Sequence, residues 1–289
     1  MALYRLHHST VYDYANPVVL GTHFMHLLPR TRPGQIIREA QLDISPMPET
    51  RRDEIDHFGN RTTTVALTGA HKQFAVSLSA TVEVEQPAPP PPEETLRWEA
   101  IAAKGLLDPD VAEYCLPSPL ATPQNEIADY AALSFLPGRK MLVALLELNQ
   151  RIYSEMNYKG GVTNNSTTAA QIVVTRTGVC QDYAHLMIAC LRALGLPGRY
   201  VSGYLRTLPL PGQVRRRGAD QSHAWVSSWL GPDVGWVDFD PTNNLLVSDE
   251  HVTLAWGRDF TDVSPLRGII LGGGRHSLKV GVDLEPVLT

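Results

Sequence analysis

A run of five prolines within nine residues, QPAPPPPEE at positions 86–94, is the feature that most restricts how this chain can fold. Proline lacks a backbone N–H and has a fixed φ, so such a run fits neither a helix interior nor a central strand. It favours the extended polyproline II conformation of a semi-rigid spacer. A ligand for a proline-binding domain is the alternative interpretation. We place a domain boundary here, with residues 87–94 as the linker.

The residues before the linker have the pattern of an antiparallel β domain. Positions 62–67 and 74–84 are rich in β-branched residues and partly alternate between apolar and polar side chains, as half-buried strands do. Proline, glycine and asparagine at 16–17 and 32–34 separate such runs as turns. We therefore predict a β-rich N-terminal domain at residues 1–86.

After the linker, the pattern changes to helices followed by strands. Apolar residues recur at three- and four-residue steps in the helical segments, which indicates amphipathic helices with one buried face. Helices are predicted near 125–134, 138–156, 169–174 and 180–194. Strands are predicted at 199–207, 221–230 and 235–240. Helices segregated from an antiparallel sheet are typical of an α+β domain.

These elements predict two parts after the linker. Residues 95–248 form the α+β domain, of which 95–156 is a helical lead-in. Residues 249–289 form a C-terminal β extension with a turn at the three glycines 272–274.

Composition excludes some function classes. Hydrophobic residues make up 43% of the 289 residues and charged residues 19%, a balance typical of a folded globular protein. The net charge of −5 offers no support for binding nucleic acid. The one basic cluster, Arg215, Arg216 and Arg217, is expected to lie in a solvated loop. No apolar run reaches the length needed to span a membrane, so no membrane partner is expected.

The cysteines indicate a reducing compartment. Three cysteines in a chain of this length do not form a disulfide framework. Cys190 lies on a predicted helix, where it is expected to pack as a small apolar residue, and spacing suggests no partner for Cys115. The first residues lack the apolar segment of a secretory signal. We therefore predict a cytoplasmic protein.

The third cysteine, Cys180, lies in the segment RTGVCQDYAH at 176–185, where a glycine-containing turn is predicted to begin a helix. A helix N-terminus carries roughly half a positive charge, which favours a thiolate. A neighbouring base can then make such a cysteine a nucleophile. Asp182 acts in the opposite direction, because a nearby carboxylate raises the pKa of a thiol unless the helix end engages it.

A histidine and two carboxylates follow Cys180 in chain order. Alternation along the strand predicted at 221–230 puts His223 on the same face as two tryptophans, where it would be covered from water. Asp238 and Asp240 share one face of the next strand, so alternation does not choose between them. The order cysteine, histidine, carboxylate is that of a triad in which the carboxylate orients the imidazole.

Together these segments resemble the transglutaminase-like superfamily. In its core domain, a cysteine at a helix N-terminus is followed by a strand with His-x-Trp-Val and then by Gly-Trp-x-x-x-Asp-Pro-Thr. The corresponding segments here are RTGVC at 176–180, HAWV at 223–226 and GWVDFDPT at 235–242. The β-rich first 86 residues also resemble the N-terminal module of bacterial members.

The resemblance implies a papain-like α+β fold and a mechanism through a thioester. It assigns catalysis to Cys180, His223 and Asp240, and leaves Asp238 as a neighbour. The family often uses an aromatic residue upstream of the nucleophile as a second oxyanion donor. Tyr158 is the candidate for that role, with structural packing of the same tyrosine as the alternative.

The activity we expect is acyl transfer from the amide bonds of a peptide or protein substrate. An amine co-substrate ends the reaction in cross-linking, and water ends it in hydrolysis. Three alternatives stay open: a cysteine protease or amidase without transfer, an arylamine acetyltransferase, and a peptide-binding module that keeps the fold. The acetyltransferase signature Arg-Gly-Gly-x-Cys is only partly matched at 176–180. No cofactor and no metal are expected, because neither paired metal-ligand spacing nor a calcium loop occurs.

Overall fold

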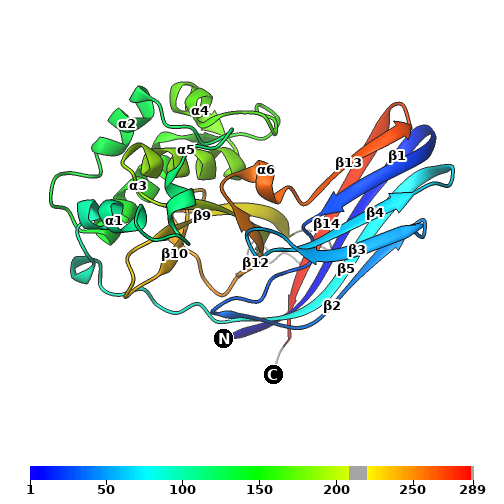
Figure 1. Cartoon of the computed structure of the whole chain (residues 1–289), viewed down its shortest axis with the longest axis horizontal. Coiled ribbons are helices and arrows are strands. Elements are labelled where there is room, and N and C mark those ends of the chain that lie inside the picture. The colour runs from blue at the N-terminus through cyan, green and yellow to red at the C-terminus, as the bar shows by residue number, and fades with distance from the viewer. Residues whose placement is uncertain (208–219, 288–289) are drawn as a thin grey trace, which may run out of the picture.

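The computed structural model shows two large β-sheets, one of them packed beneath a group of helices (Figure 1). The structure describes residues 1–207 and 220–287, so the basic cluster Arg215, Arg216 and Arg217 lies outside the described residues. One sheet is curved and stands to one side of the molecule in Figure 1, and the helices cover the other. The predicted α+β fold class is confirmed.

The first sheet, which we call the N-terminal sheet, is a curved antiparallel half-barrel built around one long strand. Its strands are β1 (Ala2–Met25), β2 (Gln35–Ser45), β3 (Thr50–Ile55), β4 (Arg61–Leu67), β5 (His71–Val84), β13 (Leu266–Gly272) and β14 (His276–Pro286). The first half of β1 lies between β5 and β14, and its second half lies between β4 and β13. The strands β13 and β14, late in the sequence, therefore pair with the first strand, β1.

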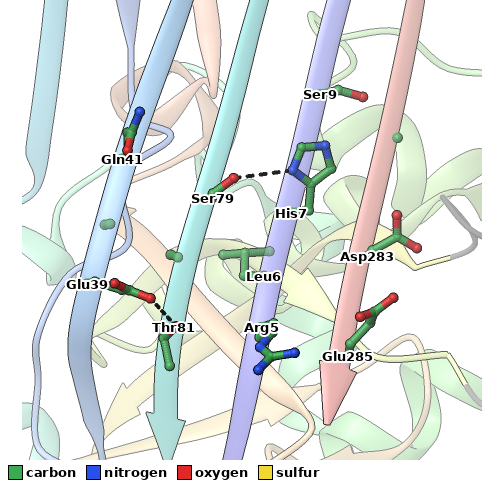
Figure 2. A pocket seen from close by; sticks show the side chains of 13 residues that line it. Arg5, Leu6, His7, Ser9, Glu39, Gln41, Ser79, Thr81, Asp283 and Glu285 are labelled. Atoms are coloured by element: carbon green, nitrogen blue, oxygen red, sulfur yellow. Dashed lines mark hydrogen bonds between the residues drawn. The ribbon is translucent and has the colours of Figure 1, made fainter. Parts of the chain in front are cut away.

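Alternation along the strands gives this sheet two different faces. In β5 the apolar residues Phe74, Val76, Leu78 and Val82 are buried, because every second side chain points into the core. The opposite face is polar and forms a cavity of about 890 Å³ over β1, β2, β5 and β14 (Figure 2). Glu39 and Thr81 are hydrogen-bonded there at 2.9 Å. None of the predicted catalytic residues lines this cavity.

The second sheet, which we call the core sheet, lies under the helices. Its strands are β8 (Gly198–Leu205), β9 (Gln221–Trp229), β10 (Trp236–Asp240), β11 (Leu245–Leu246) and β12 (His251–Gly257). They pair antiparallel in the order β11-β10-β9-β8-β12. The three strands predicted from alternation are β8, β9 and β10, within a few residues of their predicted ends.

The helices follow the linker. They are α1 (Trp98–Gly105), α2 (Asn125–Ala132), α3 (Met141–Glu155), α4 (Ala169–Thr175), α5 (Cys180–Ala193) and α6 (Phe260–Val263), with short 3-10 turns at Pro92–Glu94 and Ala112–Cys115. Two-residue strands β6 (Asn157–Tyr158) and β7 (Thr177–Gly178) pair in parallel just before α5. Within the described part of the chain, none of the helices has both the length and the apolar character needed to cross a membrane.

Helix α5 is the central helix of this layer. Its residues Tyr183, Leu186, Met187 and Cys190 are all buried, as their spacing predicts. Gly195, which has a φ of 70°, ends it in the left-handed conformation that glycine adopts without strain. The chain then returns as β8, and the side chain of Leu191 lies so near Gly198 that a Cβ there would approach it within 2.9 Å.

The segment 249–289, expected as one C-terminal extension, is divided between the two sheets. Strand β12 forms the edge of the core sheet beside β8, whereas β13 and β14 join the N-terminal sheet. The turn predicted at 272–274 lies between these last two strands, and all three glycines there have positive φ.

Two buried amide side chains join the sheets at the free edge of β12. Gln35 donates to the carbonyl of Thr253 at 2.7 Å and accepts from its N–H at 2.8 Å. Asn60 makes the same pair of bonds with the backbone of Trp256, at 2.8 and 2.9 Å. Both amide residues are fully buried. The amides thus take the place of a further strand, because they satisfy backbone groups that an edge strand leaves unpaired.

Candidate active site

Cys180 is the first residue of α5, as the sequence predicts. The side chain is partly exposed and carries a free thiol. The carboxylate of Asp182 accepts from the N–H of Val179 at 2.8 Å and from the hydroxyl of Thr163 at 2.7 Å. Burial raises the pKa of Asp182, and these two bonds oppose that rise. Asp182 is therefore engaged by the end of the helix, the condition under which its charge acts least on the thiol.

Gly178 keeps this helix entrance compact. A Cβ at this position would lie 2.7 Å from the Cβ of Asp182 and 2.8 Å from one of its carboxylate oxygens. Those distances are shorter than real Cβ contacts, so a larger residue would displace the carboxylate from the N–H of Val179.

His223 and Asp240 are brought together from adjacent strands. Nε2 of His223, on β9, lies 2.8 Å from Oδ2 of Asp240 at the end of β10. His223 is 7% exposed and Asp240 is fully buried, so little water competes for this bond. Because Nε2 faces the carboxylate, Nδ1 is the ring nitrogen left to exchange a proton with the sulfur of Cys180.

The surroundings favour the charged forms of both residues. Burial by itself lowers the pKa of His223, but the hydrogen bond with Asp240 and the interaction with Cys180 outweigh it and raise the pKa to about 10. Burial by itself raises the pKa of Asp240, yet hydrogen bonds from His223, His251 and Asn243 hold it well below its usual range. The interaction with Cys180 also places the thiol within electrostatic reach of the imidazole.

Asp240 accepts more hydrogen bonds than the triad alone provides. Oδ1 accepts from the backbone N–H groups of Thr242 at 2.9 Å and Asn243 at 3.2 Å. Oδ2 accepts from the side chain of Asn243 at 2.7 Å and lies 3.3 Å from Nε2 of His251. Neither Asn243 nor His251 was predicted from the sequence as part of the site. Asn243 directly follows the Asp-Pro-Thr segment, so its closeness to Asp240 in the sequence could have indicated a contact. His251 lies on β12, and nothing in the sequence around it indicates a contact with Asp240.

Asp238 has a different partner. It lies 3.4 Å from the guanidinium of Arg32, which comes from the N-terminal domain. It lines a cavity of about 740 Å³ together with Arg199 and two tryptophans, Trp236 and Trp256, on which Arg199 stacks at 4.1 and 3.8 Å. The structure thus separates the two carboxylates that alternation left equivalent.

Tyr158 lies beside the segment that leads into Cys180. In the β6–β7 pair it is opposite Gly178, two residues before Cys180. The side chain is 53% exposed and its ring packs edge-on against Tyr183 at 6.1 Å. Burial, followed by the charges of Cys180 and Asp182, raises the pKa of Tyr158, so the hydroxyl stays protonated and can donate. Its position suits an oxyanion donor, and its ring contact suits the packing alternative.

One group of described side chains has the composition of a metal site. Potential ligand atoms of His223, Asp240 and His251 lie within 4.8 Å of one another, and all three residues are buried. Both imidazoles already lie at hydrogen-bonding distance from the carboxylate, so the contacts are accounted for by proton sharing.

Two protein families match successive parts of the chain. Residues 4–83 match the bacterial transglutaminase-like N-terminal region, and residues 137–241 match the transglutaminase-like superfamily. The chain belongs to the transglutaminase-like superfamily. The second match begins before α3 and ends directly after Asp240, so it contains Cys180, His223 and Asp240.

Relatives within the transglutaminase-like superfamily are similar to different extents. The chain is 38% identical to an uncharacterized protein of Mycobacterium tuberculosis, Rv2569c, over 98% of its own length and 92% of that protein. A stretch of 69 residues, 24% of the chain, is 42% identical to the protein-glutamine gamma-glutamyltransferase of Pseudomonas aeruginosa and covers 10% of it. The crystal structure of a "Putative Cysteine Protease" from Cytophaga hutchinsonii matches with a TM-score of 0.79 at 25% identity, covering 100% of this chain and 91% of that one.

Proposed function

We propose that this transglutaminase-like protein is a thiol acyl-transfer enzyme that acts on amide bonds of peptides or proteins. The observation that carries the proposal is the buried 2.8 Å contact between His223 and Asp240, within electrostatic reach of a cysteine at a helix N-terminus. A nucleophile, a base and a group that orients the base are the parts that such chemistry requires.

The charge state favours attack by sulfur. With a pKa of about 10, His223 holds its proton at neutral pH and stabilises a thiolate on Cys180 as an ion pair. The positive end of α5 adds to that stabilisation. The thiolate, not the thiol, is the nucleophile in acyl transfer.

In the first half of the proposed reaction, the sulfur of Cys180 attacks the carbonyl carbon of the substrate amide. A C–S bond forms, and the electrons of the C=O bond move to the oxygen. The N–H of Cys180, at the helix N-terminus, and the hydroxyl of Tyr158 are the donors we propose for that oxyanion. The C–N bond then breaks as His223 gives its proton to the leaving amine or ammonia, which leaves a thioester.

In the second half, neutral His223 takes a proton from water or from an amine co-substrate. The deprotonated oxygen or nitrogen attacks the thioester carbon, and the thiolate leaves. Water gives hydrolysis, and an amine gives transamidation. The similarity to the Pseudomonas gamma-glutamyltransferase supports transfer, and the similarity to the Cytophaga structure supports a protease or amidase.

Thiol labelling followed by product analysis tests the proposal. We expect iodoacetamide to label Cys180 well below the ordinary thiol pKa of about 8.5, while buried Cys115 and Cys190 stay unlabelled in the folded protein. Incubation with casein should then release ammonia, release new amino termini or incorporate dansylcadaverine, and Cys180→Ala should abolish whichever occurs. An inert Cys180 in the folded protein would instead support the peptide-binding module.

We further propose a cytoplasmic site of action, on the basis of the cysteines. Cys115, Cys180 and Cys190 are all free thiols in the structure, and burial raises the pKa of Cys115 to about 11, which protects it from oxidation. Cell fractionation with an antibody against the native protein tests this location.

A further inference from the structure

We propose that His251 is a positioning residue of this site, which holds Asp240 in place as a carboxylate while His223 gives up its proton. The proposal rests on the proposed function for its chemistry. It concerns a residue that lies outside the part of the chain matching the superfamily, which ends at residue 241.

His251 lies on the edge strand β12 of the core sheet, whereas Asp240 lies on β10. In the strand order, β10 and β12 are separated by β9 and β8. The side chain nevertheless lies 3.3 Å from Oδ2 of Asp240, the same oxygen that faces His223. It is 1% exposed, so water does not offer Asp240 an alternative donor in its place.

Packing fixes the imidazole in that orientation. Its ring lies edge-on to Trp225 at 5.2 Å between centroids, and the Trp225 ring covers Gly203 of the intervening strand β8. A Cβ at Gly203 would lie 2.3 Å from the Trp225 ring. The absence of a side chain at Gly203 therefore leaves room for the Trp225 ring, which packs against the imidazole of His251.

The backbone fixes which nitrogen of His251 donates. The N–H of Ser248 points at Nδ1 at 3.4 Å, so Nδ1 is the acceptor and the ring proton is on Nε2. His251 thus offers Asp240 the N–H of Nε2. That arrangement differs from His223, which gives and takes a proton during the reaction.

The N–H of His251 acts in both charge states of His223: it positions Asp240 beside the imidazolium in the resting site, and it stabilises the carboxylate when His223 is neutral. Once His223 has protonated the leaving group, the fully buried carboxylate of Asp240 loses its cationic partner. Burying an unpaired charge is costly, and the fixed N–H groups of His251 and Asn243 offset that cost. They also keep Oδ2 directed at Nε2 of His223.

A pair of substitutions separates the hydrogen bond from the packing. His251→Gln keeps an N–H near the position of Nε2, whereas His251→Phe keeps a ring and removes the donor. We expect H251F to slow iodoacetamide alkylation of Cys180 at neutral pH roughly tenfold and H251Q to stay within about threefold, since one bond to a charged group is removed only in the first. In H251F, the pH at which alkylation becomes fast should also rise, because a misplaced Asp240 stabilises the imidazolium less.

A matched control is His8→Phe. His8 is equally buried and bonds to Thr10 at 2.7 Å and Tyr204 at 2.9 Å, away from Cys180. H8F should lower the melting temperature and leave the alkylation profile unchanged. Nitrogen NMR of labelled histidines should show a protonated Nε2 and an unprotonated Nδ1 for His251.

Two results would overturn the proposal: an alkylation profile of folded H251F identical to that of the unmodified protein, or equal losses in H251Q and H251F. The measurement uses no substrate. Failure of the proposed function, seen as a reactive Cys180 that turns over no amide, is therefore distinguishable from failure of this inference.

Discussion

At the scale of single residues, the site depends on how Asp240 and His223 set each other's charge. Asp240→Asn removes the carboxylate that raises the pKa of His223, so that only the interaction with Cys180 still opposes the lowering of this pKa by burial. We expect turnover to fall by on the order of 1,000-fold to 10,000-fold, as for loss of a triad carboxylate. In the unmodified protein, turnover should be lost only as pH rises through about 10, where His223 loses its proton. A pH–rate profile of each protein measures the fall in turnover of D240N and the pH at which the unmodified protein loses turnover.

The control for this prediction lies two residues away. Asp238→Asn removes a carboxylate from the same strand, but that carboxylate pairs with Arg32 and does not contact His223. The alkaline limb should stay near pH 10 in D238N. A limb that moves equally in both variants would show that general charge, not the contact, controls His223.

The sequence alone could not separate these two aspartates. Alternation put both on one face, and only the likeness to a known motif selected Asp240. Their difference arises from partners that are distant in the chain, Arg32 for one and His251 for the other. Local pattern carries no information on such contacts, which is also why His251 was missed.

At the scale of elements, the start of α5 decides where the thiol sits. Asp182→Ala removes the acceptor for the N–H of Val179 and the hydroxyl of Thr163. We expect a loss of about 1 kcal/mol in the free energy of unfolding, the usual size for a helix cap. Denaturant unfolding measures it. Asp182→Asn keeps an oxygen acceptor and should lose less than half as much, so equal losses would argue against capping.

The sequence predicts the position of α5 closely because the signals for this helix are local. A glycine turn precedes it, apolar residues repeat along it and Gly195 ends it. Helix α1 was not predicted as a separate element, although it falls within the helical lead-in predicted at 95–156. A helix such as α5 can therefore be predicted from the sequence because its start signal, its apolar face and its stop signal all lie within or beside it.

At the scale of the whole molecule, the two sheets depend on each other through the edge of β12. Gln35→Ala would leave the buried N–H and carbonyl of Thr253 without partners. We expect the free energy of unfolding to fall by about 3 kcal/mol, the range for unsatisfied buried groups. Gln41→Ala, on an exposed position of the same strand, should change it by less than about 0.5 kcal/mol. Two separate unfolding transitions in Q35A would show that the sheets had become independent.

The division of the C-terminal segment was beyond the sequence for a related reason. Alternation indicated strands after residue 249, but a strand's pattern does not name the sheet that it joins. Here β12 pairs with β8, whereas β13 and β14 pair with β1, which is far from them in the sequence. The fold class could be predicted from local patterns, and the pairing of distant strands could not.

The central position of β1 has a consequence for how the protein is made. The ribosome delivers β1 first and its neighbours β13 and β14 last, after every helix and strand of the core sheet. One side of β1 therefore stays unpaired while residues 26–265 are synthesised, which at roughly 5–20 residues per second takes on the order of ten seconds or more. An uncovered strand edge is a template for pairing with other chains. The nascent protein should thus be most prone to aggregation just before β13 and β14 are synthesised, and most dependent on chaperones at that moment.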